Sequence, residues 1–482
     1  MTQLVSALIK FLSYVPFIKY LFKIYYLKSL ADIKNEYKEK NNIIDVILTS
    51  SISSKDFIFG RSDLNFLIVV ANECHPKAIL KEFRSFVYSK FLLKLTVNHI
   101  YIPILTENEF NTDVVKSFLM RKSHKDSTKW ESVLSHHKYL FYLRKQDRFA
   151  ITYTGVQNLD LFFLKERAPK PSFSKTKNLI IAINTLLKFQ LLSSQADTTW
   201  TQISMRLRRY PILIKRLSSK FELAIWSILT QTQCSHQQNK KYQDFPLEKE
   251  LSKYFHSLLQ LSFINDFTIT PSLIQSRTNE IQGKLFIDIH INQEVMKKSY
   301  VKSLNHLISG IKRFENNKLK FRVRLTTDSL YQLQNEKALY PFPLEALYRK
   351  QKTYSVKKFH YNFLIQHDQI IHASIHFMII QFMRFRSLQQ KTELIGSKFI
   401  KSLNLMYKYY LLAEYLKGNE FKVELSEKKI REKLTPQFSE VSLDDVVTEE
   451  QWVIIKAQLI YLLKEIRDEL AKDNQGLKVL RF

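Results

Sequence analysis

The chain has 482 residues, of which 45% are hydrophobic and 25% charged, so it can bury a sizeable core and is not an intrinsically disordered protein. Its formal net charge of +29 favours polyanionic partners such as nucleic acid, nucleotides or an anionic membrane face, the plain alternative being a generally basic, solvated surface. The two cysteines, Cys74 and Cys234, exclude a disulfide framework and indicate a reducing, cytoplasmic compartment.

Residues 4–30 are rich in large apolar side chains but are interrupted by lysines, so they contain no uncharged stretch long enough to cross a bilayer. Apolar residues recur there at near-helical spacing, at Leu8, Leu12, Val15, Phe22 and Tyr26. The pattern predicts an N-terminal amphipathic helix within residues 1–40. We expect it to dock on its own domain, and contact with a membrane surface is the alternative.

The next region alternates strands and helices and predicts a mixed sheet with flanking helices over residues 41–166. The expected elements are strands at 43–48, 64–70 and 98–105, a helix at about 76–91, and one or two helices within 113–144. A proline-containing segment without periodicity, residues 167–174, marks the boundary that follows.

The rest of the chain is predicted to be largely helical around a small α/β region. The expected parts are a helical domain at 172–265, a small α/β region at 270–345 and a C-terminal helical domain at 355–482. The last helix begins at Thr448, where Gln451 completes a capping-box pattern. The overall prediction is therefore an α+β protein.

Two strand–helix–strand segments resemble each other, at 64–109 and 285–329. The distance from the strand centre to a following threonine is 39 positions in both, from Leu67 to Thr106 and from Asp288 to Thr327. Because βαβ units are common, chance similarity is one explanation. An internal repeat is the other, and it would make the later segment a second, small βαβ unit derived from the same half-fold.

The chemistry-bearing residues lie between the first two expected strands. Asp63 and Asn65 are two positions apart at the entry to the second strand, so their side chains project to the same face. Two oxygen ligands in this arrangement suit a hard cation such as Mg²⁺. The hydroxyls and backbone amides of Ser50 and Ser51 suit the phosphates of a triphosphate beside it. A simple strand-entry turn is the alternative explanation for Asp63 and Asn65.

The run from Ser50 to Val70 resembles the signature of the nucleotidyltransferase superfamily of the polymerase β type. That signature is Gly-Ser, a loop of ten to a dozen residues, and Asp-apolar-Asp on the next strand. Ser51 takes the place of its serine and Asp63 that of its first acid. The resemblance implies that Ser50, Ser51 and Ser62 bind nucleotide phosphates, that Asp63 and Asn65 bind Mg²⁺, and that Asp63 is the catalytic residue.

The departures from the signature predict a degenerate member. Ser50 replaces the glycine and Asn65 replaces the second acid. The strand that should carry the third acid, at 98–105, contains no carboxylate, and Glu107 and Glu109 would have to reach back from beyond it. We therefore predict a protein that binds a nucleoside triphosphate with Mg²⁺ and is catalytically weakened or inactive, and an active nucleotidyltransferase is the enzyme alternative.

Basic runs outside the motif favour nucleic acid as a second partner. The strongest contains no acid and consists of Arg206, Arg208, Arg209, Lys215, Arg216 and Lys220. A second one spans 349–358. Either run suits an RNA or DNA backbone, and a solvated helix face is the structural alternative. The alternative function is thus a basic nucleic-acid-binding protein that uses an inactive nucleotidyltransferase fold as a scaffold.

Overall fold

The structure is a computed structural model. It describes the residues 12, 15–49, 64–90, 104–120, 127–142, 147–163, 182–187, 249–271, 273, 283–292, 298–315, 319–357, 365–388, 394–422 and 446–482. Over these ranges the protein is α+β, as the sequence predicts. Within the same ranges, no helix combines the length and the apolar character needed to cross a membrane.

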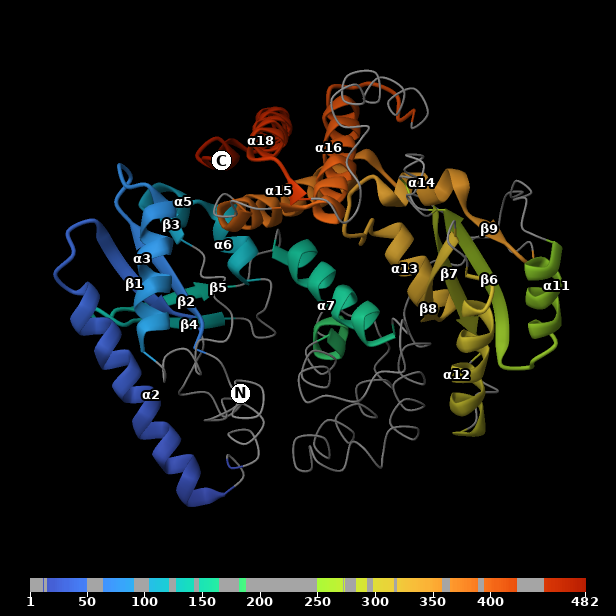
Figure 1. Cartoon of the computed structure of the whole chain (residues 1–482), viewed down its shortest axis with the longest axis horizontal. Helices are drawn as coiled ribbons and strands as arrows, with labels where there is room; N and C mark the ends of the chain where they lie inside the picture. Colours follow the sequence, from blue (N-terminus) through green and yellow to red (C-terminus); the bar gives the residue numbers. More distant parts are fainter. Residues whose placement is uncertain are drawn as a thin grey trace. The chain divides into compact units, whose positions relative to one another are not determined.

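Internal contacts divide the chain into two units. The first comprises Met1–Asp147, Met378–Glu393 and Ala471–Phe482, and the second Arg148–Phe377 and Leu394–Leu470. Each unit contains one mixed sheet (Figure 1). The two sheets are described separately below.

The sheet of the first unit has the strand order β3-β2-β1-β4-β5. Its strands are β1 (Ile43–Leu48), β2 (Phe66–Val70), β3 (Ile104–Thr106), β4 (Ser127–Ser132) and β5 (Lys138–Tyr142). Strand β2 runs antiparallel to β1 and parallel to β3. The helices of this part are α2 (Pro16–Tyr37), α3 (Pro76–Ser89), α5 (Glu107–Asn111) and α6 (Asp113–Met120). Strand β1 has the predicted bounds.

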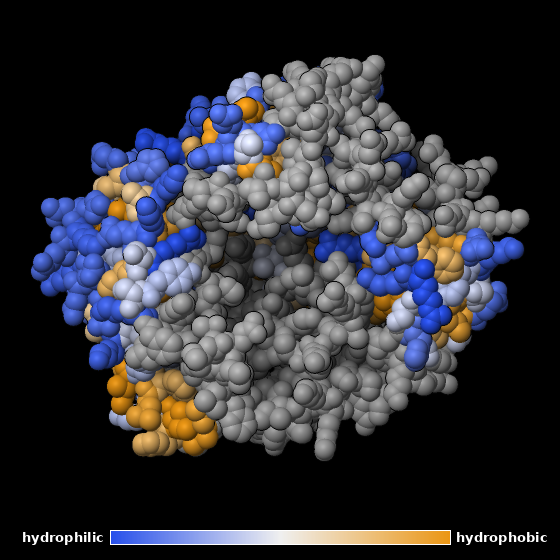
Figure 2. All heavy atoms as spheres, viewed as in Figure 1, coloured by the Kyte–Doolittle hydropathy of each residue, from blue (hydrophilic) through white to orange (hydrophobic). Residues whose placement is uncertain are grey.

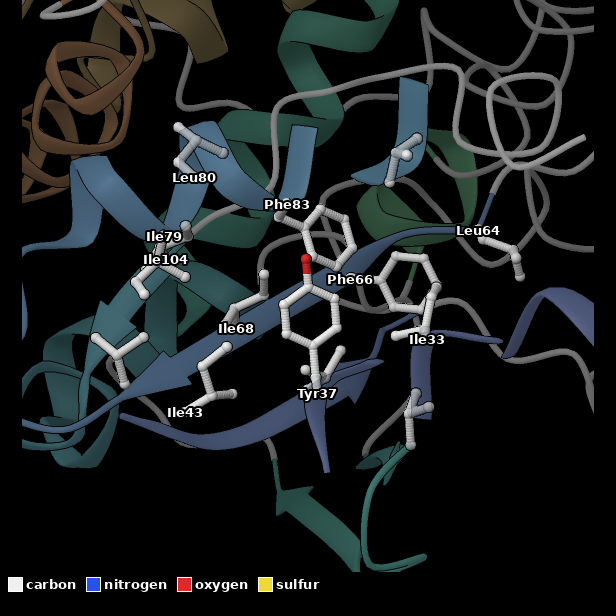
Figure 3. Packing of buried hydrophobic residues seen from close by; sticks show 14 of the residues in the cluster. Ile33, Tyr37, Ile43, Leu64, Phe66, Ile68, Ile79, Leu80, Phe83 and Ile104 are labelled. Carbon is white, nitrogen blue, oxygen red and sulfur yellow. The ribbon is translucent and has the colours of Figure 1, made fainter. Parts of the chain in front are cut away.

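Helices α2 and α3 cover one face of this sheet. Helix α3 begins with a proline at its first turn and buries Ile79, Leu80, Phe83 and Val87, which lie on one side of the helix. The rings of Tyr37 on α2 and Phe66 on β2 both pack on Phe83, as Figure 3 shows. The alternate residues of β2, Phe66, Ile68 and Val70, therefore face these helices.

Of the helix expected over 113–144, the part from Asp113 to Met120 is helical, and the prediction is wrong for residues 127–142. Strands β4 and β5 form an antiparallel hairpin, with Ser127 opposite Tyr142 and Glu131 opposite Lys138. The turn passes through His136, whose φ is 60°. A left-handed conformation at a residue other than glycine or asparagine gives no turn signal in the sequence, so the hairpin was not predicted.

The sheet of the second unit has the order β8-β7-β6-β9. Its strands are β6 (Ile264–Pro271), β7 (Gly283–Ile291), β8 (Leu319–Thr326) and β9 (Tyr354–Ser355). Strand β7 is antiparallel to β6 and parallel to β8. The helices associated with it are α11 (Lys249–Leu258), α12 (Lys298–Lys312), α13 (Asp328–Glu336) and α14 (Glu345–Lys352).

The first three strands of the two sheets repeat one topology at a constant shift of 221 positions. In both, the pairing of the first two strands contains a bulge, between Ile43 and Asp45 and between Ile264 and Asp266. In both, a threonine at the third strand's end caps the following helix. Thr106, the last residue of β3, accepts a hydrogen bond from the amide of Glu109, and Thr327, the residue after β8, accepts one from the amide of Leu330. The two sheets thus share a bulge, a parallel pair of strands and a threonine cap. These shared features support an internal repeat over chance similarity.

The remaining described elements are mostly helices. They are α7 (Asp147–Phe163), α15 (His367–Leu388), α16 (Gly396–Leu416), α18 (Glu449–Leu470), the 3-10 helix η2 (Gln475–Leu477) and the two-residue strands β10 (Leu394–Ile395) and β11 (Val446–Val447). The predicted capping box at the start of α18 is confirmed, since Thr448 and Gln451 exchange side-chain and backbone hydrogen bonds.

Candidate functional site

One of the predicted site residues, Asn65, lies in the part of the chain that the structure describes. The others lie outside it: Ser50, Ser51, Ser62, Asp63, Arg206, Arg208, Arg209, Lys215 and Arg216. The geometry of the predicted site is therefore built from its two flanks, the end of β1 and the start of β2.

These two flanks are joined by hydrogen bonds. The backbone amide of Thr49 donates to the carbonyl oxygen of Asn65 at 2.8 Å, and the Thr49 hydroxyl donates to the same oxygen at 3.0 Å. The described residues on either side of segment 50–63 are therefore hydrogen-bonded to each other, at the end of β1 and the start of β2. The serines that the sequence assigns to phosphate and the acid that it assigns to Mg²⁺ belong to this one closed segment.

Asn65 is exposed and lies on the sheet face opposite to α2 and α3. Side chains alternate along β2, and Phe66, Ile68 and Val70 pack into the core formed with those helices. Asn65 shares the other face with Leu67 and Val69. Its amide carbonyl is a neutral oxygen ligand, suited to Mg²⁺ only together with at least one carboxylate. Among the residues that the structure describes, no cluster of His, Cys, Asp and Glu forms a metal site by itself.

Glu107 and Glu109 do not supply the third acid. Strand β3 ends at Thr106, which pairs with Val70 at the end of β2. Asn65 lies at the opposite end of β2, just before its first residue. At about 3.3 Å per residue, the length of β2 separates these carboxylates from Asn65 by roughly 16 Å. The buried Glu109 side chain accepts from the amide of Thr106 at 2.9 Å and from that of Arg481 at 3.4 Å. Its carboxylate caps α5 instead.

A buried acid that the sequence did not single out lies on β1. Asp45 accepts hydrogen bonds from the hydroxyls of Ser132 and Tyr139, both at 2.6 Å. Burial and the hydrogen bond to Asp45 raise the pKa of the Tyr139 phenol well above its usual range. Because Asp45 is four positions before Thr49 and its oxygens are engaged by β4 and β5, it joins the strands and is not part of the predicted site.

The second unit has the same arrangement around Asp266. The Ser355 hydroxyl and the amide of Lys357 donate to its two carboxylate oxygens. Burial raises the pKa of Asp266 above its ordinary range, although hydrogen bonds from Ser355 and Lys357 and the proximity of His290 oppose this. Asp45 and Asp266 are therefore equivalent positions of the repeat, each bonded to a serine of the neighbouring strand.

The second unit has no equivalents of the residues that the sequence assigns to Mg²⁺. The constant shift takes Asp63 and Asn65 to Lys284 and Phe286. The same sheet face carries Asp288, whose two oxygens accept hydrogen bonds from Arg324 Nε at 2.7 Å and from Arg349 Nη1 at 2.9 Å. Burial alone would raise the pKa of Asp288, but the two guanidinium groups hold it below its usual range.

Arg349 belongs to this ion network and not to a basic surface. Its guanidinium lies over the rings of Phe286 and Tyr340, and its Nε is 3.5 Å from Glu345 Oε1. Since the side chain is almost completely buried, Arg349 is not available to a phosphate backbone. The basic run expected at 349–358 therefore loses its first member.

A threonine–histidine–aspartate chain also crosses the second sheet. His290 Nδ1 is 2.7 Å from Asp328 Oδ1, and its Nε2 is 3.0 Å from Thr268 Oγ1. The same atoms in an open cleft would suit a nucleophile, its base and an orienting acid. Thr268 and His290 are fully buried, however, so the chain joins β6, β7 and α13 and presents no hydroxyl to a substrate.

No protein-family model, no curated protein and no solved structure matches this chain.

Proposed function

We propose that the first unit is a nucleotidyltransferase-like module that binds a nucleoside triphosphate with Mg²⁺ and turns it over weakly or not at all. The observation that carries the proposal is the run from Ser50 to Val70 together with the closure of its flanks by Thr49 and Asn65. The sheet order supports it, since β1, β2 and β3, the strands on which the motif depends, are direct neighbours.

The proposed roles follow from the chemistry of each group. Asp63 provides the negative charge of the metal site and Asn65 its second oxygen. Ser50, Ser51 and Ser62 donate hydrogen bonds to the phosphates. Mg²⁺, when bound, would neutralise phosphate charge during transfer.

Weak or absent turnover follows from the missing acids. Glu109 is engaged in the cap of α5, so it does not accept the proton of an attacking hydroxyl at the proposed site. Removal of one such group from a phosphoryl-transfer site commonly lowers the rate by orders of magnitude.

Thermal shift measurements with ATP, GTP, CTP and UTP, each with and without Mg²⁺, test the nucleotide site. The wild type should be stabilised by at least one nucleotide in the presence of Mg²⁺, and Asp63→Ala should lose that shift. The exposed Glu73, on the loop between β2 and α3, provides a matched control, because Glu73→Ala should keep it. No shift with any nucleotide would contradict the proposal.

The second candidate is a nucleic-acid-binding protein that retains this fold as a scaffold. The net charge of +29 and the acid-free run from Arg206 to Lys220 favour it. Binding to single-stranded RNA should then weaken steeply with salt and should persist in Asp63→Ala. Affinity that is the same at low and moderate salt would exclude this candidate.

A further inference from the structure

Helix α2 carries apolar residues on two opposite sides. One side packs on the sheet of its own unit through Tyr26, Ile33 and Tyr37. This confirms the expected docking for Tyr26 and the partly buried Phe22, whereas Val15 is exposed. The other side is apolar as well, which a helix that faces only water does not require.

The outward side forms a continuous stripe in the first three turns. Its members follow at helical spacing and keep large exposed fractions: Phe17 70%, Tyr20 60%, Leu21 49%, Ile24 49% and Leu27 50%. We call this set the α2 stripe. Figure 2 shows hydrophobic residues gathered at the lower left of the visible face, where Figure 1 places α2. A contiguous exposed patch of this kind marks an interaction surface.

Charge around the α2 stripe indicates the kind of partner. The exposed Lys23 and Lys28 accompany it, and the segment from Pro16 to Ala31 contains no acid. The acids of α2 come later and are already in ion pairs, Asp32 with Lys90 at 3.5 Å and Glu36 with Lys40 at 3.0 Å. The stripe is thus an apolar surface with positive charge at its edges.

We propose that the α2 stripe docks the protein onto an anionic lipid surface. Leucine, isoleucine and phenylalanine enter the boundary between headgroups and acyl chains, while Tyr20 and the lysines remain among the headgroups. Because the opposite side of α2 is fixed to the sheet, the helix lies parallel to the membrane without detaching from its unit. The mode is peripheral.

Other occupants fit this surface less well. A second copy related by twofold symmetry would bring Lys23 and Lys28 against their own equivalents, which costs energy through like-charge repulsion. Protein interfaces are also poor in lysine. A nucleic acid would match the lysines but would not replace water over Leu21 and Ile24 favourably.

Vesicle co-sedimentation of the full chain tests the proposal. The wild type should bind vesicles of phosphatidylcholine mixed with phosphatidylserine and should bind much less to phosphatidylcholine alone. The double variant Leu21→Asn/Ile24→Asn should lose most of this binding. Lys23→Gln and Lys28→Gln should each weaken it about five-fold, as expected for a single cation near an anionic surface.

The matched control is Val453→Asn/Ile454→Asn on α18, where two similarly exposed apolar residues are replaced far along the chain. It should bind vesicles like the wild type, and circular dichroism should show that both double variants are folded. Asp63→Ala should also bind normally, which separates this proposal from the nucleotide site. Wild-type protein that ignores anionic vesicles would overturn the proposal. So would a stripe variant that binds unchanged, or one whose only effect is to dissociate a dimer.

Discussion

Asp45 and Asp266 occupy the same position in two sheets, each directly after a bulge and each bonded to a serine of the adjacent strand. The Ser132 hydroxyl donates to Asp45 and the Ser355 hydroxyl donates to Asp266. The next residues correspond too, since Val133 and Val356 each donate a backbone hydrogen bond to the residue after the aspartate, Val46 or Phe267. An aspartate kept at this place in both copies indicates that the repeat needs it structurally.

Replacement of Asp45 by alanine should lower the free energy of unfolding by about 2–4 kcal/mol, because it leaves the Ser132 and Tyr139 hydroxyls without their acceptor. Urea unfolding followed by circular dichroism measures this. Tyr139→Phe, which removes one donor to Asp45, should cost only about 1–2 kcal/mol. An Asp45→Ala variant as stable as the surface control Glu73→Ala would contradict the structural role.

Asp266 and Asp288 should respond to pH with opposite signs. Burial raises the folded-state pKa of Asp266, so its contribution to stability is complete below the unfolded value of about 3.9 and declines as the pH rises through the folded value. The wild type should therefore lose stability relative to Asp266→Asn as the pH rises above about 4.

For Asp288 the sign is reversed. Arg324 and Arg349 lower its folded-state pKa against the effect of burial, so its contribution is present above about pH 3.9 and is lost as the pH falls through the folded value. The difference in free energy of unfolding between the wild type and Asp288→Asn should become smaller as the pH falls. Urea unfolding of the two variants across the same pH series measures both trends, and parallel trends would refute the assignment.

Arg349→Met should lower the free energy of unfolding by about 3–5 kcal/mol, because it leaves Asp288 and Glu345 buried with one fewer cation. Adding Asp288→Asn should recover part of that loss, which a double-mutant cycle measures. Arg322→Met, at an exposed position on strand β8, should change stability by less than about 0.5 kcal/mol.

The effect of Gly310→Ala on stability should depend on whether the Tyr254 side chain is present. A Cβ built there would lie 2.9 Å from Cζ of Tyr254 and closer still to its hydroxyl, so Gly310→Ala must displace that ring. In a Tyr254→Ala background the obstacle is gone, and the alanine should stabilise α12 by up to about 1 kcal/mol through helix propensity. Thermal denaturation of the wild type, the two single variants and the double variant measures the effect of Gly310→Ala in each background. A stabilising Gly310→Ala in the wild-type background would contradict the contact.

For the proposed nucleotide site, Asn65→Asp should increase the affinity for Mg²⁺ in the presence of nucleotide, on the order of tenfold, because it would add a charged oxygen ligand to the one assigned to Asp63. Titration calorimetry with Mg²⁺ and a nucleoside triphosphate measures the change. Asn65→Ser is the matched neutral variant and should show no gain. Equal affinities in all three proteins would place the metal elsewhere.

The sequence predicted what depends on local pattern and missed what depends on tertiary pairing. Strand β1, helix α3 and the α18 cap follow from alternation, helical spacing and capping chemistry, and they are correct. The β4–β5 hairpin was missed because β4 is mostly polar and its turn contains His136 in place of glycine. The partners of Asp45 and Asp288 lie far away along the chain, so no spacing rule could assign them.

The hydrogen bonds between Thr49 and Asn65 also bear on how this region can change over evolution. They hold the base of segment 50–63 together whatever the segment contains. The entropic cost of loop closure grows slowly, by about 0.6 kcal/mol for each doubling of length. Insertions and substitutions in this segment should therefore be tolerated without rearrangement of the sheet.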